Sequence, residues 1–172
     1  MTTTPQILLV EDLPMDIRLT EEILRHSGVT AEMFAVTDGA QALDFLYQRG
    51  DFAHRAPGYP LLVLLDLKMP RVDGFDVLRQ IKGDPNLKVI PIIVLTSSTH
   101  HDDIRRAYDL GANAYMVKEI DFPTHAAGIE AAVRFWLHVN MPPPLCARRN
   151  ITGTSLKEPA AESSGSSTPS GR

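Results

Sequence analysis

Residues 61–66 read LLVLLD, five apolar residues in a row closed by an aspartate. A run without polar alternation is typical of a strand buried on both faces, as in a parallel sheet that helices cover on either side. Four other short runs rich in branched apolar residues share this character, and a segment of helical spacing follows each of them. We expect strands at residues 7–10, 31–36, 61–65, 92–95 and 114–117.

Turn signals separate these strands from the helical segments. The first helix ends near Ser27-Gly28, the third at Gly83-Asp84-Pro85 and the fourth at Gly111, while the last spans about 123–139. Five strands that alternate with five helices predict an α/β fold with an open parallel sheet wound on both sides, because right-handed crossovers leave little other choice.

Length and composition indicate one globular domain with a short extension. The chain has 172 residues, of which 44% are hydrophobic and 22% charged. We place the domain at residues 1–140. A Met-Pro-Pro-Pro run at 141–144 cannot continue a helix, and Ser, Gly, Thr and Pro dominate the last eleven or so residues. Residues 141–172 are therefore interpreted as an extended arm and a flexible tail, with no effector domain.

Composition also limits compartment and partners. Cys146 is the only cysteine, so an internal disulfide is excluded and a reducing compartment fits. The N-terminus lacks the basic flank of a signal peptide, and no apolar run approaches the ~18 residues of a membrane span. We expect a cytoplasmic protein without membrane contact. A net charge of −4 argues against DNA as a partner, because DNA binding needs a basic face.

Polar residues follow four of the expected strands. They are Glu11-Asp12, Asp66, Thr96-Ser97 and Lys118. Because the carboxyl ends of parallel strands meet at one edge of the sheet, these side chains should converge there. Crowded carboxylates persist around a cation, and Mg²⁺ binds through one or two carboxylates and a phosphate. Asp12 and Asp66 fit that role.

The same arrangement suits phosphoryl transfer. An oxygen of Asp66 can attack phosphorus and form an acyl phosphate. Lys118 and the Thr96 hydroxyl can then stabilise charge on the phosphoryl oxygens. The sequence therefore predicts a phosphorylatable switch.

Four motifs, in order and at strand ends, resemble the receiver domain of two-component response regulators. They are LLVED at 8–12, LDLKMP at 65–70 with Asp73-Gly74, VLTS at 94–97 and AYMVK at 114–118. The resemblance covers about residues 5–140 and implies a flavodoxin-like (βα)5 fold with strand order 2-1-3-4-5.

The resemblance also implies individual roles. Asp66 would be the phosphoacceptor, and Glu11 and Asp12 the acid pair that binds Mg²⁺ together with Asp66 and the backbone carbonyl of Lys68. Thr96 would be the switch hydroxyl, Tyr115 the aromatic residue whose rotamer follows phosphorylation, and Lys118 the lysine that contacts the phosphate.

Two positions depart from the family pattern. Glu119 follows Lys118 where the family usually has proline, often with a cis bond; a non-proline cis bond costs ~3 to 4 kcal/mol, so a trans loop is expected. Lys68 stands two positions past the acceptor, where its charge would act on the water that reaches the acyl phosphate.

A long loop at residues 49–60 and the missing effector domain resemble the stand-alone regulators that pair with phytochrome-type histidine kinases. In that subgroup the last helix and the segment after it commonly form a homodimer. The last helix here carries an apolar stripe of Ile129, Ala132, Val133 and Trp136, whereas Phe135 falls roughly 120° from its centre. We expect Phe135 and Trp136 at an interface.

Structural explanations compete at several positions. Asp12 before Leu13-Pro14 also suits a helix N-cap, and Ser97 suits a cap for the fourth helix. Tyr115 also suits the core. The adjacent His100 and His101 point about 100° apart on a helix and are interpreted as solvated rather than metal ligands. Residues 163–168 suit a modification site less well than a disordered tail.

The sequence therefore predicts a response regulator that accepts a phosphoryl group from a histidine kinase on Asp66 and signals through its fourth helix, fifth strand and fifth helix. It would catalyse only its own phosphoryl transfer and dephosphorylation. A small aspartyl-phosphate phosphohydrolase would need an acid where Lys68 stands. A phosphate-independent dimeric adaptor is the other alternative; the complete set of acceptor residues argues against it, and Glu119 in place of proline keeps it open.

Overall fold

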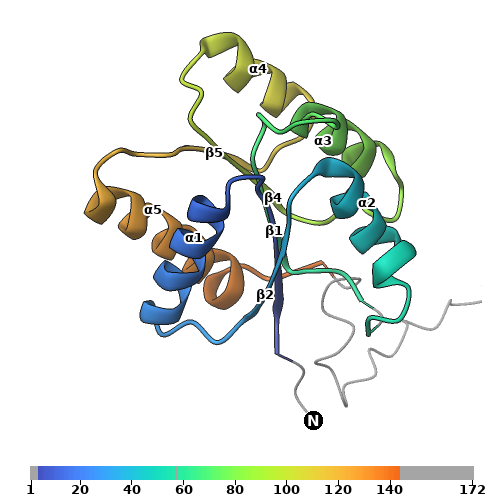
Figure 1. The fold of residues 1–172 in the computed structure, drawn as a ribbon, viewed down its shortest axis with the longest axis horizontal. Coiled ribbons are helices and arrows are strands. Elements are labelled where there is room, and N and C mark those ends of the chain that lie inside the picture. Colours follow the sequence, from blue (N-terminus) through green and yellow to red (C-terminus); the bar gives the residue numbers. More distant parts are fainter. Residues whose placement is uncertain (1–3, 57, 144–172) are drawn as a thin grey trace, which may run out of the picture.

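A computed structural model describes residues 4–56 and 58–143. The tail expected beyond Pro143, Cys146 and residues 163–168, for which a disordered tail was preferred to a modification site, lie outside these ranges. Five parallel strands form one sheet in the order β2-β1-β3-β4-β5, which confirms the α/β, flavodoxin-like prediction (Figure 1). The strands are β1 (Gln6–Val10), β2 (Glu32–Val36), β3 (Leu62–Leu65), β4 (Ile92–Thr96) and β5 (Ala114–Val117).

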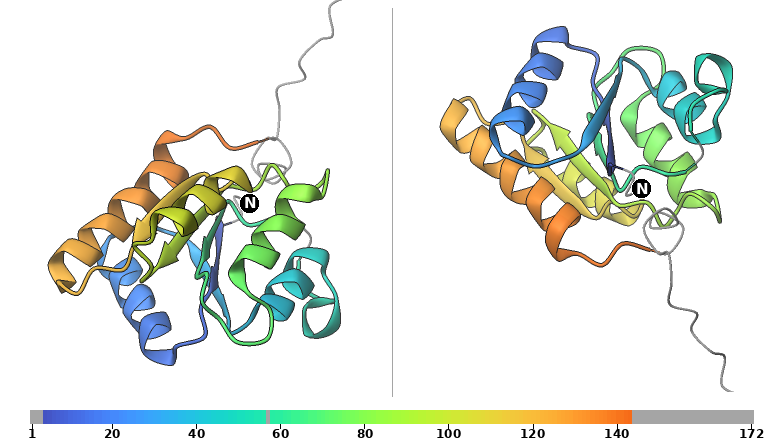
Figure 2. Two further views of the ribbon diagram at one scale, coloured as in Figure 1. Left: turned by 90° about the horizontal axis from the view of Figure 1, so that it is seen from above. Right: turned by 90° about the horizontal axis from the view of Figure 1, so that it is seen from below.

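Helices cover both faces of the sheet. They are α1 (Pro14–His26), α2 (Gly39–Tyr47), α3 (Gly74–Gly83), α4 (His101–Asp109) and α5 (Phe122–Arg134). In Figure 1, α1 and α5 lie to the left of the sheet and α2 and α3 to the right, and Figure 2 shows the two layers from above and below. Within the described ranges, no helix combines the length and the apolar character that a membrane crossing requires.

Two segments add detail that the hydrophobic pattern did not predict. Residues Phe135–Val139 continue α5 as a π-helix, so the expected helix changes its winding for its last turn. In the loop at 49–60, residues Gly50–Phe52 form a 3-10 helix, and Arg55 Nε donates to the carbonyl oxygen of Phe45 at 3.0 Å. The long loop is thus fastened to the end of α2.

Alternate residues of each central strand enter two separate cores. Leu8 and Val10 of β1 pack toward α2, α3 and α4, whereas Ile7 and Leu9 pack toward α1 and α5. The same alternation along β3 explains why the run at 61–65 is apolar throughout, since neither face meets water. Each buried aliphatic side chain contributes about 1.5 to 3 kcal/mol.

Aspartates define where three helices begin. Asp38 accepts a hydrogen bond from Gln41 N (2.9 Å), Asp73 from Phe75 N (2.6 Å) and Asp121 from Thr124 N (3.0 Å). Each caps the helix that follows, which satisfies backbone donors that the helix leaves unpaired. These caps place the beginnings of α2, α3 and α5 at the sheet edge where the strands end.

Gly74 at the start of α3 lies against the end of β3. A Cβ atom at this position would stand 2.2 Å from the carbonyl oxygen of Asp66 and 2.6 Å from Leu67 Cα. Both neighbours are backbone atoms, so no side-chain rotation relieves the contact. Only glycine lets the helix approach Asp66 this closely.

We predict that Gly74→Ala lowers the free energy of unfolding by about 1 to 3 kcal/mol, because the added methyl forces the backbones of β3 and α3 apart. Urea denaturation measures the change. Gly83→Ala is the matched control, since a Cβ there meets nothing within 4 Å and the helix favours alanine. Equal stability of the two variants would contradict the close approach of α3.

Candidate functional site

Three carboxylates meet where β1 and β3 end. One oxygen each of Glu11, Asp12 and Asp66 lie within 4.8 Å of one another. The sheet ladder fixes them, because Glu11 N donates to Val36 O (3.0 Å) and Asp66 N donates to Val10 O (2.9 Å). Glu11 and Asp66 are 1% and 6% exposed, so two acidic groups are held out of water side by side.

The Lys118 ammonium, which follows β5, bridges these acids. Its Nζ donates to Glu11 Oε2 at 2.5 Å, to Asp66 Oδ2 at 2.8 Å and to Asp16 Oδ2 at 2.8 Å. Burial alone would lower the pKa of Lys118, but the hydrogen bonds to Asp16, Asp66 and Glu11 outweigh it and raise the pKa above its ordinary value. Lys118 therefore stays charged at neutral pH.

Glu11 is the acid that burial affects most. Desolvation raises its pKa, and the hydrogen bond and charge of Lys118 offset that rise only in part. Glu11 Oε1 also accepts a hydrogen bond from Leu13 N at 3.1 Å, which ties the carboxylate to the start of α1. Its ionised form thus depends on nearby positive charge.

Asp12 does not act as a helix cap. The N-cap of α1 is Leu13, without a side-chain hydrogen bond, and Pro14 occupies the first turn. Within residues 4–56 and 58–143, the Asp12 carboxylate has neither a hydrogen-bond partner nor an ion-pair partner, and it stands beside Glu11 and Asp66. The N-cap interpretation of Asp12 was therefore wrong.

The three carboxylates offer the oxygen donors that hard divalent cations prefer. Two of the acids are buried, and a single lysine supplies the positive charge that faces them. A dication beside Glu11, Asp12 and Asp66 would compensate the remaining negative charge. The donor set thus fits Mg²⁺ or a cation of similar character.

The backbone around Asp66 completes its surroundings. Lys68 N donates to Asp66 Oδ1 at 3.0 Å, while Lys118 holds the other carboxylate oxygen. The side chain of Lys68 is exposed. Arg71, in the left-handed region at φ 68°, reaches from the same loop to the buried Asp38 carboxylate at 2.5 Å. This ion pair joins the loop after β3 to the start of α2.

Thr96 and Tyr115 are connected through the loop between β4 and α4. Thr96 is fully buried, and its Oγ1 accepts from Ser98 N at 3.4 Å. The Tyr115 hydroxyl donates to the Ser98 carbonyl oxygen at 3.0 Å. Ser98 Oγ also donates to Asp103 at 2.5 Å, so Ser98 holds the start of α4. Ser97 is exposed and the N-cap position of α4 is His100, so the alternative of a cap at Ser97 is wrong.

Glu119, which stands where the family usually has proline, does not displace Lys118. No cis peptide bond occurs in the part of the chain that the structure describes, so the bond between Lys118 and Glu119 is trans as expected. Lys118 N donates to Thr96 O at 2.8 Å, and the side chain still reaches Asp66.

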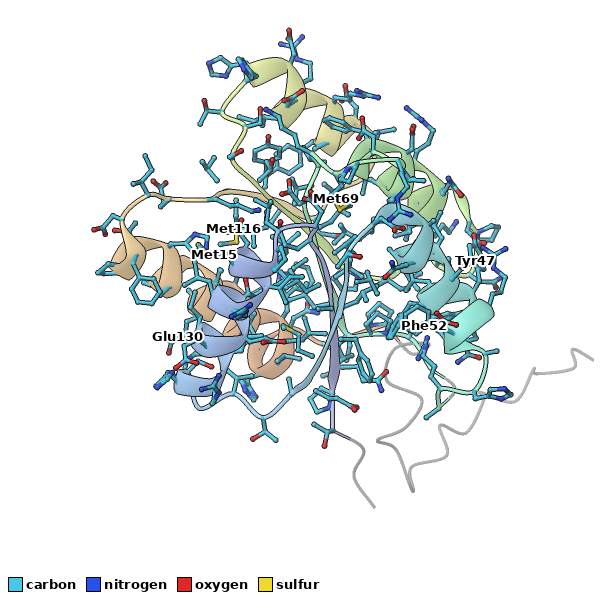
Figure 3. All side chains as sticks on the ribbon, in the orientation of Figure 1. Met15, Tyr47, Phe52, Met69, Met116 and Glu130 are labelled. Carbon is cyan, nitrogen blue, oxygen red and sulfur yellow. The ribbon has the colours of Figure 1, made fainter. Side chains whose placement is uncertain are left out.

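The remaining sequence candidates lie away from the acidic cluster. His100 and His101 are exposed, as the solvated interpretation requires. Trp136 packs partly against the core of Ile7 and Val133, whereas Phe135 is 47% exposed and meets the Trp136 ring edge-on at 5.4 Å. Figure 3 labels two methionines on opposite faces of the sheet: Met116 packs on the side of α1 and α5, and Met69 on the other side.

Asp16 is the site residue that the sequence analysis missed. It stands four residues after Asp12, on the first turn of α1, and its carboxylate contacts Lys118. Its position could have indicated it, because α1 begins two residues after Asp12, so an acid on the first turn of this helix lies near the same edge of the sheet. No strand-end rule pointed to it.

This geometry agrees with the comparisons. The protein-family model for the response regulator receiver domain matches residues 7–130. The chain belongs to the response regulator receiver family. It is a receiver-domain signalling protein, and its similarity extends over most of the described residues.

Response regulator Rcp1 of a Synechocystis strain is 40% identical over 131 residues, 76% of this chain and 88% of Rcp1. The Mn²⁺-bound form of Rcp1 superposes with a TM-score of 0.75 at 38% identity, covering 81% of this chain and 99% of that one. For the phosphorylated cyanobacterial phytochrome response regulator RcpA, the TM-score is 0.77 at 40% identity, with 82% and 99% covered.

A more distant receiver structure holds magnesium. The receiver domain of a Pseudomonas aeruginosa sensor histidine kinase, with a magnesium ion coordinated in its active site cleft, gives a TM-score of 0.60 at 28% identity. It covers 78% of this chain and 98% of that one. A receiver domain that belongs to a histidine kinase thus shares the fold of this chain.

We predict that Lys118→Met lowers the free energy of unfolding by roughly 3 kcal/mol at neutral pH without metal, since it leaves Glu11 and Asp66 buried without their cation. Because the pKa of Lys118 is raised on folding, its contribution is fully present at neutral pH and is lost only as pH rises through that raised value.

Urea denaturation of wild type, Lys118→Met and the exposed control Lys88→Met provides the measurement. The difference should shrink in acid, where Glu11, whose pKa burial raises, is among the first carboxylates to become neutral. A Lys118→Met protein as stable as the Lys88→Met control would show that the acids do not depend on this ammonium.

Proposed function

We propose that this response regulator accepts a phosphoryl group from a histidine kinase on Asp66 in a reaction that requires Mg²⁺. The observation that carries the proposal is the Asp66 carboxylate itself, buried at the end of β3 beside two further acids and in contact with Lys118. A nucleophile, a group of acids that can bind a dication and a cation for phosphoryl oxygens thus lie together at one edge of the sheet.

The transfer forms one bond and breaks one. An Asp66 oxygen attacks the phosphorus of the kinase phosphohistidine, the new O–P bond forms, and the P–N bond breaks with its electrons going to the imidazole, which leaves neutral when its other nitrogen carries a proton. Lys118 Nζ, 2.8 Å from Asp66 Oδ2, donates to a phosphoryl oxygen.

Glu11, Asp12, Asp66 and the Lys68 carbonyl would hold the metal. Mg²⁺ supplies positive charge against the phosphoryl oxygens and the carboxylates when it is bound. The Mn²⁺ in the Rcp1 structure and the magnesium in the Pseudomonas receiver domain support this choice. The chain's own acids provide the binding energy, and Asp12, which has no other partner among the described residues, contributes most directly.

Thr96 and Tyr115 carry the signal outward in this proposal. The Thr96 hydroxyl turns to the phosphoryl group, which releases Ser98 N and moves the loop that Tyr115 holds through the Ser98 carbonyl. The changed surface is the α4-β5-α5 face. The protein catalyses only its own phosphoryl transfer and dephosphorylation, since Lys68 stands where a phosphohydrolase needs an acid.

The first experiment incubates the protein with a small acyl phosphate and Mg²⁺ and follows intact mass. We expect the gain of one phosphoryl group, lost in Asp66→Asn because an amide is not a nucleophile for phosphorus, and lost on chelation because the reaction requires the metal.

Asp76→Asn is the matched control, since Asp76 is an exposed acid on α3. It should gain the phosphoryl group like wild type. A wild-type mass that never changes would contradict the proposal and favour the phosphate-independent dimeric adaptor.

The kinase partner is proposed to be of the phytochrome type. RcpA is a cyanobacterial phytochrome response regulator, and it shares 40% identity with this chain over nearly the whole length of RcpA. A kinase of this kind draws phosphate from ATP, so the proposal places the encounter in the cytoplasm.

We also propose a homodimer through α5 and the segment after it. Exposed apolar side chains gather on and after the π-helical turn, with Phe135, Val139 and Met141 at 47%, 73% and 89% exposure. Trp136 packs on the core beside them and gives the patch a fixed base. Exposed apolar patches of this kind are typical of protein interfaces.

Phe135→Glu should convert the dimer to monomers in light scattering without unfolding the protein, because the Phe135 side chain is 47% exposed and a charge there opposes apolar contact with the partner. Phe122→Glu, a similarly exposed aromatic at the opposite end of α5, is the control and should remain dimeric. A Phe135→Glu protein of unchanged mass would move the interface elsewhere.

A further inference from the structure

His125 is a buried histidine to which the proposed reaction assigns no role. It lies on the first turn of α5 and is 7% exposed. Its Nδ1 lies 3.3 Å from the backbone nitrogen of Glu119, one residue after Lys118. An N–H can donate only to an unprotonated ring nitrogen, so this contact requires the neutral ring with its proton on Nε2.

The backbone N–H of Glu119 exists because residue 119 is not proline. Glu119 is exposed, but its N–H donates to the buried ring of His125, and a hydrogen bond of this kind contributes about 0.5 to 1.5 kcal/mol. Residue 119 thus provides the donor and His125 the acceptor of one hydrogen bond, and a proline at 119 would leave no donor.

This bond holds the loop on which Lys118 stands. On one side, Lys118 N donates to Thr96 O at 2.8 Å. On the other side, Asp121 caps α5 through Thr124 N and Thr124 Oγ1. The His125 ring fixes the peptide between these two anchors, and the orientation of that peptide sets the direction in which the Lys118 side chain leaves the backbone.

We propose that neutral His125 is a positioning residue that holds the Lys118 loop through Glu119 N–H, and that its protonation loosens the loop. The inference rests on the proposed transfer to Asp66. His125 touches no reacting atom; it acts through the backbone of residue 119.

The charges around His125 determine how it responds to pH. Asp16 faces it from α1, and Lys118 and Glu119 face it from the loop. Burial lowers the pKa of His125 below its ordinary value of 6.5, Lys118 lowers it further, and Asp16 and Glu119 act in the opposite direction. The stabilisation is therefore present above the ordinary value and is lost as pH falls through the lowered one.

The test is a double-mutant cycle on the full chain. His125→Leu removes the acceptor, Glu119→Pro removes the donor, and the readout is the initial rate of phosphoryl incorporation from a small acyl phosphate with Mg²⁺. We expect His125→Leu to slow the reaction about threefold to tenfold, the range that one hydrogen bond accounts for. In the Glu119→Pro background the same change should have little effect, because no N–H remains to satisfy.

His125→Asn is the conservative variant. Its side-chain oxygen can accept from Glu119 N near the position of Nδ1, and it does not titrate between pH 5 and 8. His125→Asn should restore most of the rate. As pH falls, wild type should lose rate through protonation of His125, and His125→Asn should not show this loss. Thermal melts of each variant separate loop effects from global unfolding.

The outcomes separate the two proposals. A wild type that gains no phosphoryl group contradicts the proposed function itself. A phosphorylated wild type with His125→Leu equally fast, or equally slowed with and without Glu119→Pro, overturns the positioning role. Parallel pH profiles for wild type and His125→Asn overturn the protonation effect.

Discussion

The contact between the Lys118 ammonium and the acids at the strand ends is the interaction on which the site depends. Glu11 and Asp66 are removed from water, and like charges at this separation would otherwise favour protonation or disorder. A lysine from β5 reaches acids that follow β1 and β3, and Asp16 adds a fourth group from α1. Charge compensation thus joins the β1–α1 segment to the ends of β3 and β5, which are distant in sequence, and it leaves Asp12 for a metal.

The fold makes this contact available at small cost. Parallel strands buried on both faces end at one edge, so residues that follow β1, β3 and β5 meet without any special loop. Gly74 lets α3 begin against Asp66, and the Asp73 cap fixes that beginning. The apolar core is therefore also the device that positions the chemistry.

Sequence reasoning succeeded where one residue type reports on one environment. Unbroken apolar runs located every strand to within a residue at each end, and the strand-end rule located Glu11, Asp66 and Lys118. It failed where a residue's contact is distant in sequence, and where either of two adjacent residues could fill the same structural role. Asp16 and Lys118 are separated by 102 positions, and Ser97 and Ser98 differ only in which of them faces the interior. The π-helical turn at 135–139 has the composition of an ordinary helix end.

Site and output surface share backbone, which explains how one phosphoryl group can act at a distance. Lys118 N donates to Thr96 O, so the lysine of the pocket and the proposed switch hydroxyl belong to the same end of the β4–β5 ladder. Thr96 contacts Ser98 N, and Ser98 in turn holds both Tyr115 and the start of α4. A change in hydrogen bonding at Thr96 therefore affects Ser98, two residues away, and through it α4 and Tyr115 of β5. No long pathway through the core is required.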